Sequence, residues 1–243
     1  MKEMEGSLEH TANEDQLRAR EYLLELFKES PIPDRDLLFN LGLYARSGLL
    51  VKFLCMYELY QRVLNVPGIF VEFGCWYGQN AVLLENLRAI LEPFNKSRRL
   101  VLFDTFTGYQ DTPGWYSTGK EYKDYLYKIL DAHVRCNVYG HIEPGHEIIE
   151  GDVVETAPRY FDDHQEAIVA MAYFDIGTYE PTLTALEAIT PHLVPGSVIL
   201  FDELTLAGGA GEARAFKEVF KQSKYKLEKM SLYPSKSLLT VLP

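Results

Sequence analysis

The chain of 243 residues is 47% hydrophobic and 24% charged, a balance typical of one globular α/β domain with additions, or at most two small domains. Its 35 acidic and 24 basic residues give a net charge of −11 with no basic stretch, which argues against a nucleic-acid partner. Three widely spaced cysteines predict free thiols in a reducing cytoplasm, and no apolar run reaches the ~18 residues of a membrane span.

An N-terminal helical extension is expected before the first strand. Residues 1–13 are polar and predicted to be a disordered lead-in, whereas apolar residues at helical spacing predict a helix over 14–30. A second, strongly apolar helix is predicted over 48–65. We expect residues 14–66 to form an extension that either packs against the following sheet or closes over a ligand as a lid.

Strand and helix patterns alternate over residues 67–243. Five buried strands are predicted, followed by two that form a hairpin at one edge: Ile69–Phe73, Leu100–Asp104, Glu147–Glu150, Ala167–Asp175, Ser197–Phe201, Tyr225–Met230 and Ser237–Leu242. Helices are predicted at about 78–92, 120–134, 181–192 and 211–222. The alternation predicts an α/β fold with a mostly parallel sheet and helices on both faces. An aromatic-rich insertion, residues 105–145, interrupts the pattern.

Acidic residues lie at or just after the carboxyl ends of the predicted strands. They are Glu72, Asp104, Asp152, Asp175, Asp202 and Glu203. Ligands of open α/β sheets bind at this edge, although a scattered polar rim without function is the alternative. Because six carboxylates on one edge repel one another, we expect a positive group to lie among them.

The turn after the first strand indicates which ligand binds. A dinucleotide site needs three glycines so that the backbone can approach a pyrophosphate, but this turn has only Gly74 and Gly78, with bulky Trp76 and Tyr77 between them. Glu72, just before the turn, would repel a phosphate and suits a sulfonium or ammonium group. The turn therefore favours a cationic cofactor over a pyrophosphate.

The following segments complete a predicted site for S-adenosylmethionine, a cation with a ribose and no phosphate. Asp104 is expected to accept the ribose hydroxyls, and Asp152 with the Val153 amide to meet the adenine edge. Gln79 and Asn80 open a helix, where they either bind the methionine carboxylate or simply cap the helix. The predicted cofactor-binding residues are Glu72, Phe73, Gly74, Cys75, Gly78, Gln79, Asn80, Asp104, Thr105, Asp152, Val153 and Asp175.

An ordered series of motifs resembles the class I methyltransferases and, more narrowly, the macrocin O-methyltransferase family with its calicheamicin-pathway branch. The motifs are Ser47–Tyr60, Val71-Glu-Phe-Gly74, Phe103-Asp-Thr-Phe-Thr-Gly108, Ala172-Tyr-Phe-Asp175 and Leu200-Phe-Asp-Glu203. The resemblance implies a Rossmann-like, seven-stranded sheet that binds S-adenosylmethionine over its first three strands. It also implies O-methylation of a sugar hydroxyl on a natural-product glycoside in antibiotic biosynthesis, by a homo-oligomer.

The resemblance further implies a divalent metal, magnesium, held by Asp175, Asp202 and Glu203. The chain departs from the family at Gly177, where a second acid is usual, and at Glu203, where aspartate is commoner. Asp175 is the best candidate for the catalytic base. Three histidines in or after the insertion are the alternatives for that role, namely His133, His141 and His146.

Two other functions stay open on the sequence alone. A nucleotide-binding oxidoreductase would use the same strand–turn–helix unit, although the missing third glycine counts against it. A non-catalytic cofactor-binding homologue would keep the fold, and the loss of an acid at Gly177 is the feature in its favour.

Overall fold

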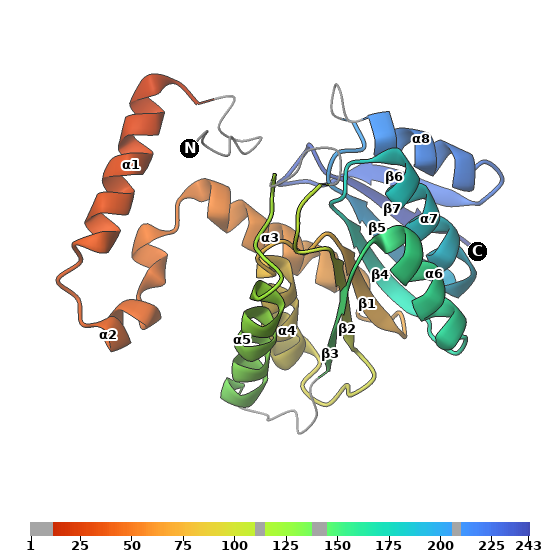
Figure 1. The fold of residues 1–243 in the computed structure, drawn as a ribbon, viewed down its shortest axis with the longest axis horizontal. Coiled ribbons are helices and arrows are strands. Elements are labelled where there is room, and N and C mark those ends of the chain that lie inside the picture. Colours follow the sequence, from red (N-terminus) through yellow and green to blue (C-terminus); the bar gives the residue numbers. More distant parts are fainter. Residues whose placement is uncertain (1–11, 110–114, 138–144, 206–209) are drawn as a thin grey trace. The chain divides into compact units, whose positions relative to one another are not determined.

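Parallel pairing of the central strands organises the fold. The structure, a computed structural model, describes residues 12–109, 115–137, 145–205 and 210–243. The seven strands follow the order β3-β2-β1-β4-β5-β7-β6, in which β7 alone is reversed and pairs antiparallel with β5 on one side and β6 on the other (Figure 1). Their bounds are β1 Ile69–Phe73, β2 Leu100–Asp104, β3 His146–Glu150, β4 Val169–Phe174, β5 Leu193–Phe201, β6 Tyr225–Lys229 and β7 Ser237–Val241. The mostly parallel, seven-stranded, Rossmann-like prediction is confirmed, including the edge hairpin.

Helices cover both faces of the sheet (Figure 1). One face carries α3 Ser47–Arg62, α4 Gln79–Leu91 and α5 Tyr122–Cys136, and the other carries α6 Val153–Asp163, α7 Tyr179–Ile189 and α8 Ala210–Val219. A short 3-10 helix, η2 Thr190–His192, follows α7. Right-handed crossovers between parallel strands place the helices in this way.

Complete burial explains why the central strands are continuous apolar runs. Every residue of β1 and β4 is buried, because helices cover both of their faces. Below the carboxyl edge the centroid of the Phe73 ring lies 5.0 Å from that of Phe103 and 4.8 Å from that of Phe174. The Phe201 ring continues the row, with its centroid 5.4 Å from that of Phe174. Each buried phenylalanine contributes roughly 2 kcal/mol of hydrophobic stabilisation.

Strand register brings the acidic strand ends to one level. Phe73 pairs with both Phe103 and Phe174, and Phe174 pairs with Phe201. The residues that follow these four phenylalanines are Gly74, Asp104, Asp175 and Asp202. The carboxyl edge of the sheet therefore gathers residues from four strands, as the strand pattern predicts.

Two helices are missing from the sequence-based prediction, the short α2 Asp34–Phe39 and the longer α6. Helix α6 begins directly after Asp152, whose side chain accepts a 2.9 Å hydrogen bond from the Val154 N–H and caps it. The interior Pro158 masks this helix in the sequence. Its buried residues nevertheless recur at helical spacing, namely Val153, Ala157, Tyr160 and Phe161.

The chain divides into two compact units, residues 1–54 and 55–243, with the division inside α3. The first contains α1 Glu14–Lys28, α2 Asp34–Phe39 and η1 Leu41–Tyr44. Asn13 and Gln16 form a capping box at the start of α1, with hydrogen bonds of 2.9 and 3.0 Å. The predicted domain limits after residues 13 and 66 stay predictions, since the lead-in lies almost wholly outside the described residues. Within the described ranges, no helix is long and apolar enough to cross a membrane.

Candidate functional site

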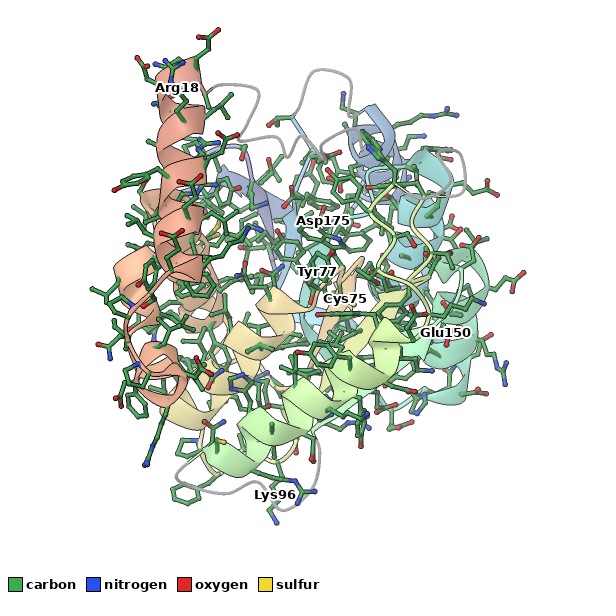
Figure 2. All side chains as sticks on the ribbon, turned by 60° about the vertical axis from the view of Figure 1, so that its left-hand side comes forward. Arg18, Cys75, Tyr77, Lys96, Glu150 and Asp175 are labelled. Atoms are coloured by element: carbon green, nitrogen blue, oxygen red, sulfur yellow. The ribbon has the colours of Figure 1, made fainter. Side chains whose placement is uncertain are left out.

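Two glycines shape the turn after β1. Gly74 has φ +82°, and a Cβ there would lie 2.3 Å from the Asp175 carbonyl oxygen. Gly78 has φ +71°, and a Cβ there would lie 2.2 Å from the Leu126 side chain. Close packing within the protein therefore requires both glycines. Figure 2 shows Cys75, Tyr77 and Asp175 gathered near one another at the carboxyl edge, whereas Lys96 lies at the opposite end of the sheet.

Asp104 joins this turn to the end of β2. Its Oδ2 accepts 2.8 Å hydrogen bonds from the N–H groups of both Cys75 and Trp76, and its Oδ1 accepts a 2.7 Å bond from the Phe106 N–H. A carboxylate has about four acceptor positions, so roughly one is left for a ribose hydroxyl. Burial raises the pKa of the Cys75 thiol, which suits its predicted role of contributing only backbone.

Glu72 lies under the turn with its side chain buried. The Asn80 Nδ2 donates a 2.9 Å hydrogen bond to Glu72 Oε1, so this amide is directed at the carboxylate. Helix α4 has Gly78 as its N-cap, and no side chain of the described residues caps it. The simple capping alternative for Gln79 and Asn80 is therefore wrong, and their contact with the cofactor stays a prediction.

Thr105, Asp152 and Val153 lie in the two neighbouring turns. The Thr105 hydroxyl donates a 3.2 Å hydrogen bond to the Gly108 carbonyl. Asp152 caps α6, and Val153 is buried in the first turn of that helix. These positions border the carboxyl edge, and cofactor binding by them stays a prediction.

An aromatic strip connects the first turn to the insertion. The Trp76 ring lies 4.4 Å from Tyr77 and 5.7 Å from Tyr116, and Tyr116 in turn contacts Tyr109 at 5.8 Å and Trp115 at 5.4 Å. Trp76 and Tyr116 have positive φ angles of 47° and 57°, as does Phe106 at 57°. Such backbone strain concentrates at functional sites. The exposed rings provide flat apolar faces next to the acidic edge.

Three acidic residues beside this strip interact electrostatically, namely Asp175, Glu203 and Glu212. Burial and then the charge of Asp175 raise the pKa of Glu203. Burial raises the pKa of Tyr109, and the charges of Asp175 and Glu203 raise it further. The third carboxylate, Glu212, is fully buried, and burial raises its pKa to about 8, with Asp175 and Glu203 adding to the effect.

Glu212, which lies in the first turn of α8, is a residue of the site that the sequence does not predict. A Cβ on Gly211 would lie 2.5 Å from the Gly177 carbonyl oxygen, so the start of α8 packs tightly on the loop after β4. The Glu212 carboxylate then accepts a 3.0 Å hydrogen bond from the Glu203 N–H. Its only sequence signal is an acid in the first turn of a helix that follows a glycine-rich loop.

The three predicted metal ligands are not brought together. Asp202 Oδ1 forms an ion pair with the Lys236 ammonium and accepts a 2.6 Å hydrogen bond from the Tyr173 hydroxyl. Glu203, in contrast, interacts electrostatically with Asp175. Among the described residues, no group of three His, Cys, Asp or Glu side chains is arranged to hold a metal ion. The predicted set therefore does not fit magnesium.

The alternative bases are not assembled either. His146 begins β3 and lies at the amino edge of the sheet, where it packs against Tyr127. His133 on α5 has its Nδ1 atom 3.3 Å from the Nδ2 atom of Asn86 on α4. His141 lies outside the described residues. The role of Asp175 as the base stays a prediction.

Known proteins resemble this chain over most of its length. The family model of macrocin O-methyltransferases (TylF) matches residues 55–231. The crystal structure of CalS11, a calicheamicin methyltransferase, is 36% identical, with a TM-score of 0.88 over 94% of this chain and 93% of that one. An apo structure of CalS11, described as a TDP-rhamnose 3'-O-methyltransferase, is also 36% identical, with a TM-score of 0.85 over 94% and 95%. The O-methyltransferase NovP, 15% identical, shares the fold, with a TM-score of 0.60 over 79% and 80%. No curated protein matches the chain.

Proposed function

The chain belongs to the macrocin O-methyltransferase family and is an S-adenosylmethionine-dependent O-methyltransferase, and from this premise we propose that it methylates a sugar hydroxyl of a natural-product precursor or glycoside. The observation that supports the proposal is the close packing of Gly74 on the Asp175 backbone carbonyl, because it places an acidic residue directly beside the cofactor turn. The 36% identity to CalS11, whose described acceptor is a nucleotide-linked sugar, supports the acceptor class.

The residues of the first turn fit the cofactor. A buried carboxylate at Glu72 and a turn without the third glycine suit a sulfonium cation better than a pyrophosphate. S-adenosylmethionine supplies the electrophilic methyl group when it is bound. The predicted contacts of Glu72, Asp104, Asp152 and the α4 N-terminus are proposed to hold it.

Asp175 is proposed to remove the proton of the acceptor hydroxyl. It lies at the carboxyl edge, where burial and then the charge of Asp175 raise the pKa of Glu203. The exposed Trp76, Tyr77 and Trp115 rings offer faces on which a sugar ring can stack. Stacking would orient one hydroxyl toward Asp175, and alignment of this kind can contribute several kcal/mol to the rate.

No step of this mechanism uses magnesium. The resemblance implies the metal, but Asp202 is engaged by Lys236 and Tyr173. The positive charge near these acids therefore comes from the chain itself.

A panel of nucleotide-linked and aglycone-linked sugars tests the acceptor class. Each acceptor is incubated with the enzyme and S-adenosylmethionine, and mass spectrometry detects methylated product together with S-adenosylhomocysteine. We expect product with at least one sugar and loss of turnover in Asp175→Asn. Turnover with a non-sugar phenol or catechol alone would contradict the proposal. Cofactor binding without turnover on any acceptor would favour the non-catalytic alternative.

A homo-oligomer is proposed as well. The first compact unit carries exposed apolar side chains on α2 and η1, including Leu38, Phe39 and Leu43. Exposed apolar patches commonly mark subunit interfaces. Light scattering coupled to size exclusion would give the mass of a dimer or larger assembly, and a monomer across concentrations would contradict it.

A further inference from the structure

Lys236 is a buried lysine held in the turn between β6 and β7. Its side chain is only 5% exposed. Its N–H donates a 3.0 Å hydrogen bond to the Tyr233 carbonyl, and its own carbonyl accepts a 2.9 Å bond from the Met230 N–H. The hairpin therefore fixes the backbone from which this side chain extends.

The ammonium group of Lys236 is directed at a rim carboxylate. It forms an ion pair with Asp202 Oδ1, the oxygen that also receives the Tyr173 hydroxyl at 2.6 Å. Two rings flank it, with the Tyr233 centroid at 4.5 Å and the Tyr173 centroid at 5.6 Å. Aromatic faces stabilise a cation at these distances. One carboxylate and two aromatic rings thus fix the place of one positive charge.

This charge lies next to the proposed base. Asp202 directly follows Phe201, and its N–H donates a 3.0 Å hydrogen bond to the Phe174 carbonyl, the residue before Asp175. Tyr173 interacts electrostatically with Asp175 as well as bonding to Asp202. The Lys236–Asp202–Tyr173 cluster therefore borders the acceptor side of the site.

A buried lysine is costly unless it is paired, and a metal ion at Asp202 would have to displace it. Lys236 and Tyr173 already engage Asp202 Oδ1, and a metal ion on the same carboxylate would lie close to the ammonium, where like charges repel strongly at low dielectric. The rim acids also need a positive group among them, which Lys236 supplies. The same site lacks a carboxylate at Gly177.

We propose that the Lys236 ammonium takes the place at Asp202 that a divalent metal would otherwise occupy, so that this chain methylates its acceptor without a metal. Lys236 is a positioning residue, because it acts through Asp202 and not on the reacting atoms. The inference rests on the proposed function only for its turnover readout, since metal binding can be measured without any acceptor.

Electron paramagnetic resonance with Mn²⁺ as the probe tests the inference on the full chain. We expect that the wild type does not bind one equivalent of Mn²⁺ at a millimolar concentration of the metal, and that Asp202→Asn gives the same result. Lys236→Met removes the ion pair at Asp202, so this variant is expected to bind Mn²⁺ at least tenfold more tightly than the wild type. The Lys236→Met/Asp202→Asn double variant is expected to lose that gain in affinity. Lys229→Met is the matched control, because Lys229 is exposed on β6.

Thermal unfolding and turnover complete the test. Lys236→Met is expected to have a lower Tm that Mn²⁺ raises, and wild-type turnover is expected to be unchanged in excess chelator. Stoichiometric Mn²⁺ binding by the wild type that Asp202→Asn abolishes would overturn the inference, even if Lys236→Met fails to fold. If the enzyme binds no Mn²⁺ and methylates no sugar, the proposed acceptor class is wrong, whereas the role of Lys236 at Asp202 is still supported.

Discussion

The backbone N–H of Glu203 donates a 3.0 Å hydrogen bond to the Glu212 carboxylate, which joins the end of β5 to the first turn of α8. Glu203 lies at the acidic edge, and Glu212 is fully buried behind it. Any change in the charge of Glu212 therefore acts on both the stability of the fold and the position of the loop that carries Glu203.

Glu212→Gln is expected to change how stability depends on pH. Because the pKa is raised from 4.5 to about 8, the folded state keeps a proton between these values that the unfolded state releases. Wild-type stability contributed by this group therefore falls as pH rises from about 4.5 to 8 and then levels off. The Glu212→Gln variant keeps a hydrogen-bond acceptor but has no proton to release. Its free energy of unfolding at pH 8 should therefore exceed that of the wild type by a few kcal/mol.

Urea unfolding at a series of pH values measures this difference. Glu187→Gln is the control, because Glu187 is exposed on α7. Wild-type and Glu212→Gln profiles that run parallel from pH 5 to 8 would show that Glu212 is ionised in the folded protein.

Gly74→Ala is expected to lower both stability and cofactor affinity. The new Cβ would lie 2.3 Å from the Asp175 carbonyl oxygen at φ +82°, which costs at least 1–2 kcal/mol for the left-handed backbone alone. Calorimetry with S-adenosylhomocysteine should show at least tenfold weaker binding, and Tm should fall. Gly42→Ala is the control, because a Cβ there meets no described atom within 4 Å. Equal effects of the two substitutions would contradict the prediction.

Asp104→Asn is expected to loosen the first turn. The amide keeps one oxygen acceptor and replaces the other with a donor, so at least one of the N–H bonds from Cys75, Trp76 and Phe106 is lost. A hydrogen bond to a charged group contributes about 1.5–3 kcal/mol, which corresponds to a tenfold or greater loss of S-adenosylhomocysteine affinity by calorimetry. Asp162→Asn, on the exposed surface of α6, should leave the affinity unchanged.

Trp115→Ala is expected to separate acceptor binding from cofactor binding. The half-exposed Trp115 ring packs on Tyr116, and loss of a stacking face costs about 1 kcal/mol. The KM for the sugar should therefore rise about fivefold, while S-adenosylhomocysteine affinity stays the same. Phe94→Ala is a control, since Phe94 is exposed in the loop between α4 and β2. An unchanged KM would remove Trp115 from the acceptor site.

The sequence predicted the parts of the fold that local burial determines. β1 and β2 begin and end where the apolar runs predicted, because strands buried on both faces are made mostly of apolar residues. Helix α6 escaped notice because Pro158 interrupts its pattern. Its amphipathic spacing was present but was outweighed by the proline.

The site was less predictable because side-chain direction and long-range packing decide it. Asp202 and Glu203 are adjacent in the sequence, but Asp202 is held by Lys236 and Tyr173, whereas Glu203 interacts with Asp175. Lys236 and Glu212 reach the site through the hairpin and through the contact of Gly211 with Gly177. Neither contact leaves a local pattern in the sequence.

The row of Phe73, Phe103, Phe174 and Phe201 has a consequence for how this enzyme can change. The four rings form one close-packed layer directly beneath the edge that carries Asp104, Asp175 and Asp202. Because packed interiors are barely compressible, this layer sets the height of the edge independently of the segments above it. Substitutions in the insertion, residues 105–145, are therefore expected to leave the position of this edge unchanged.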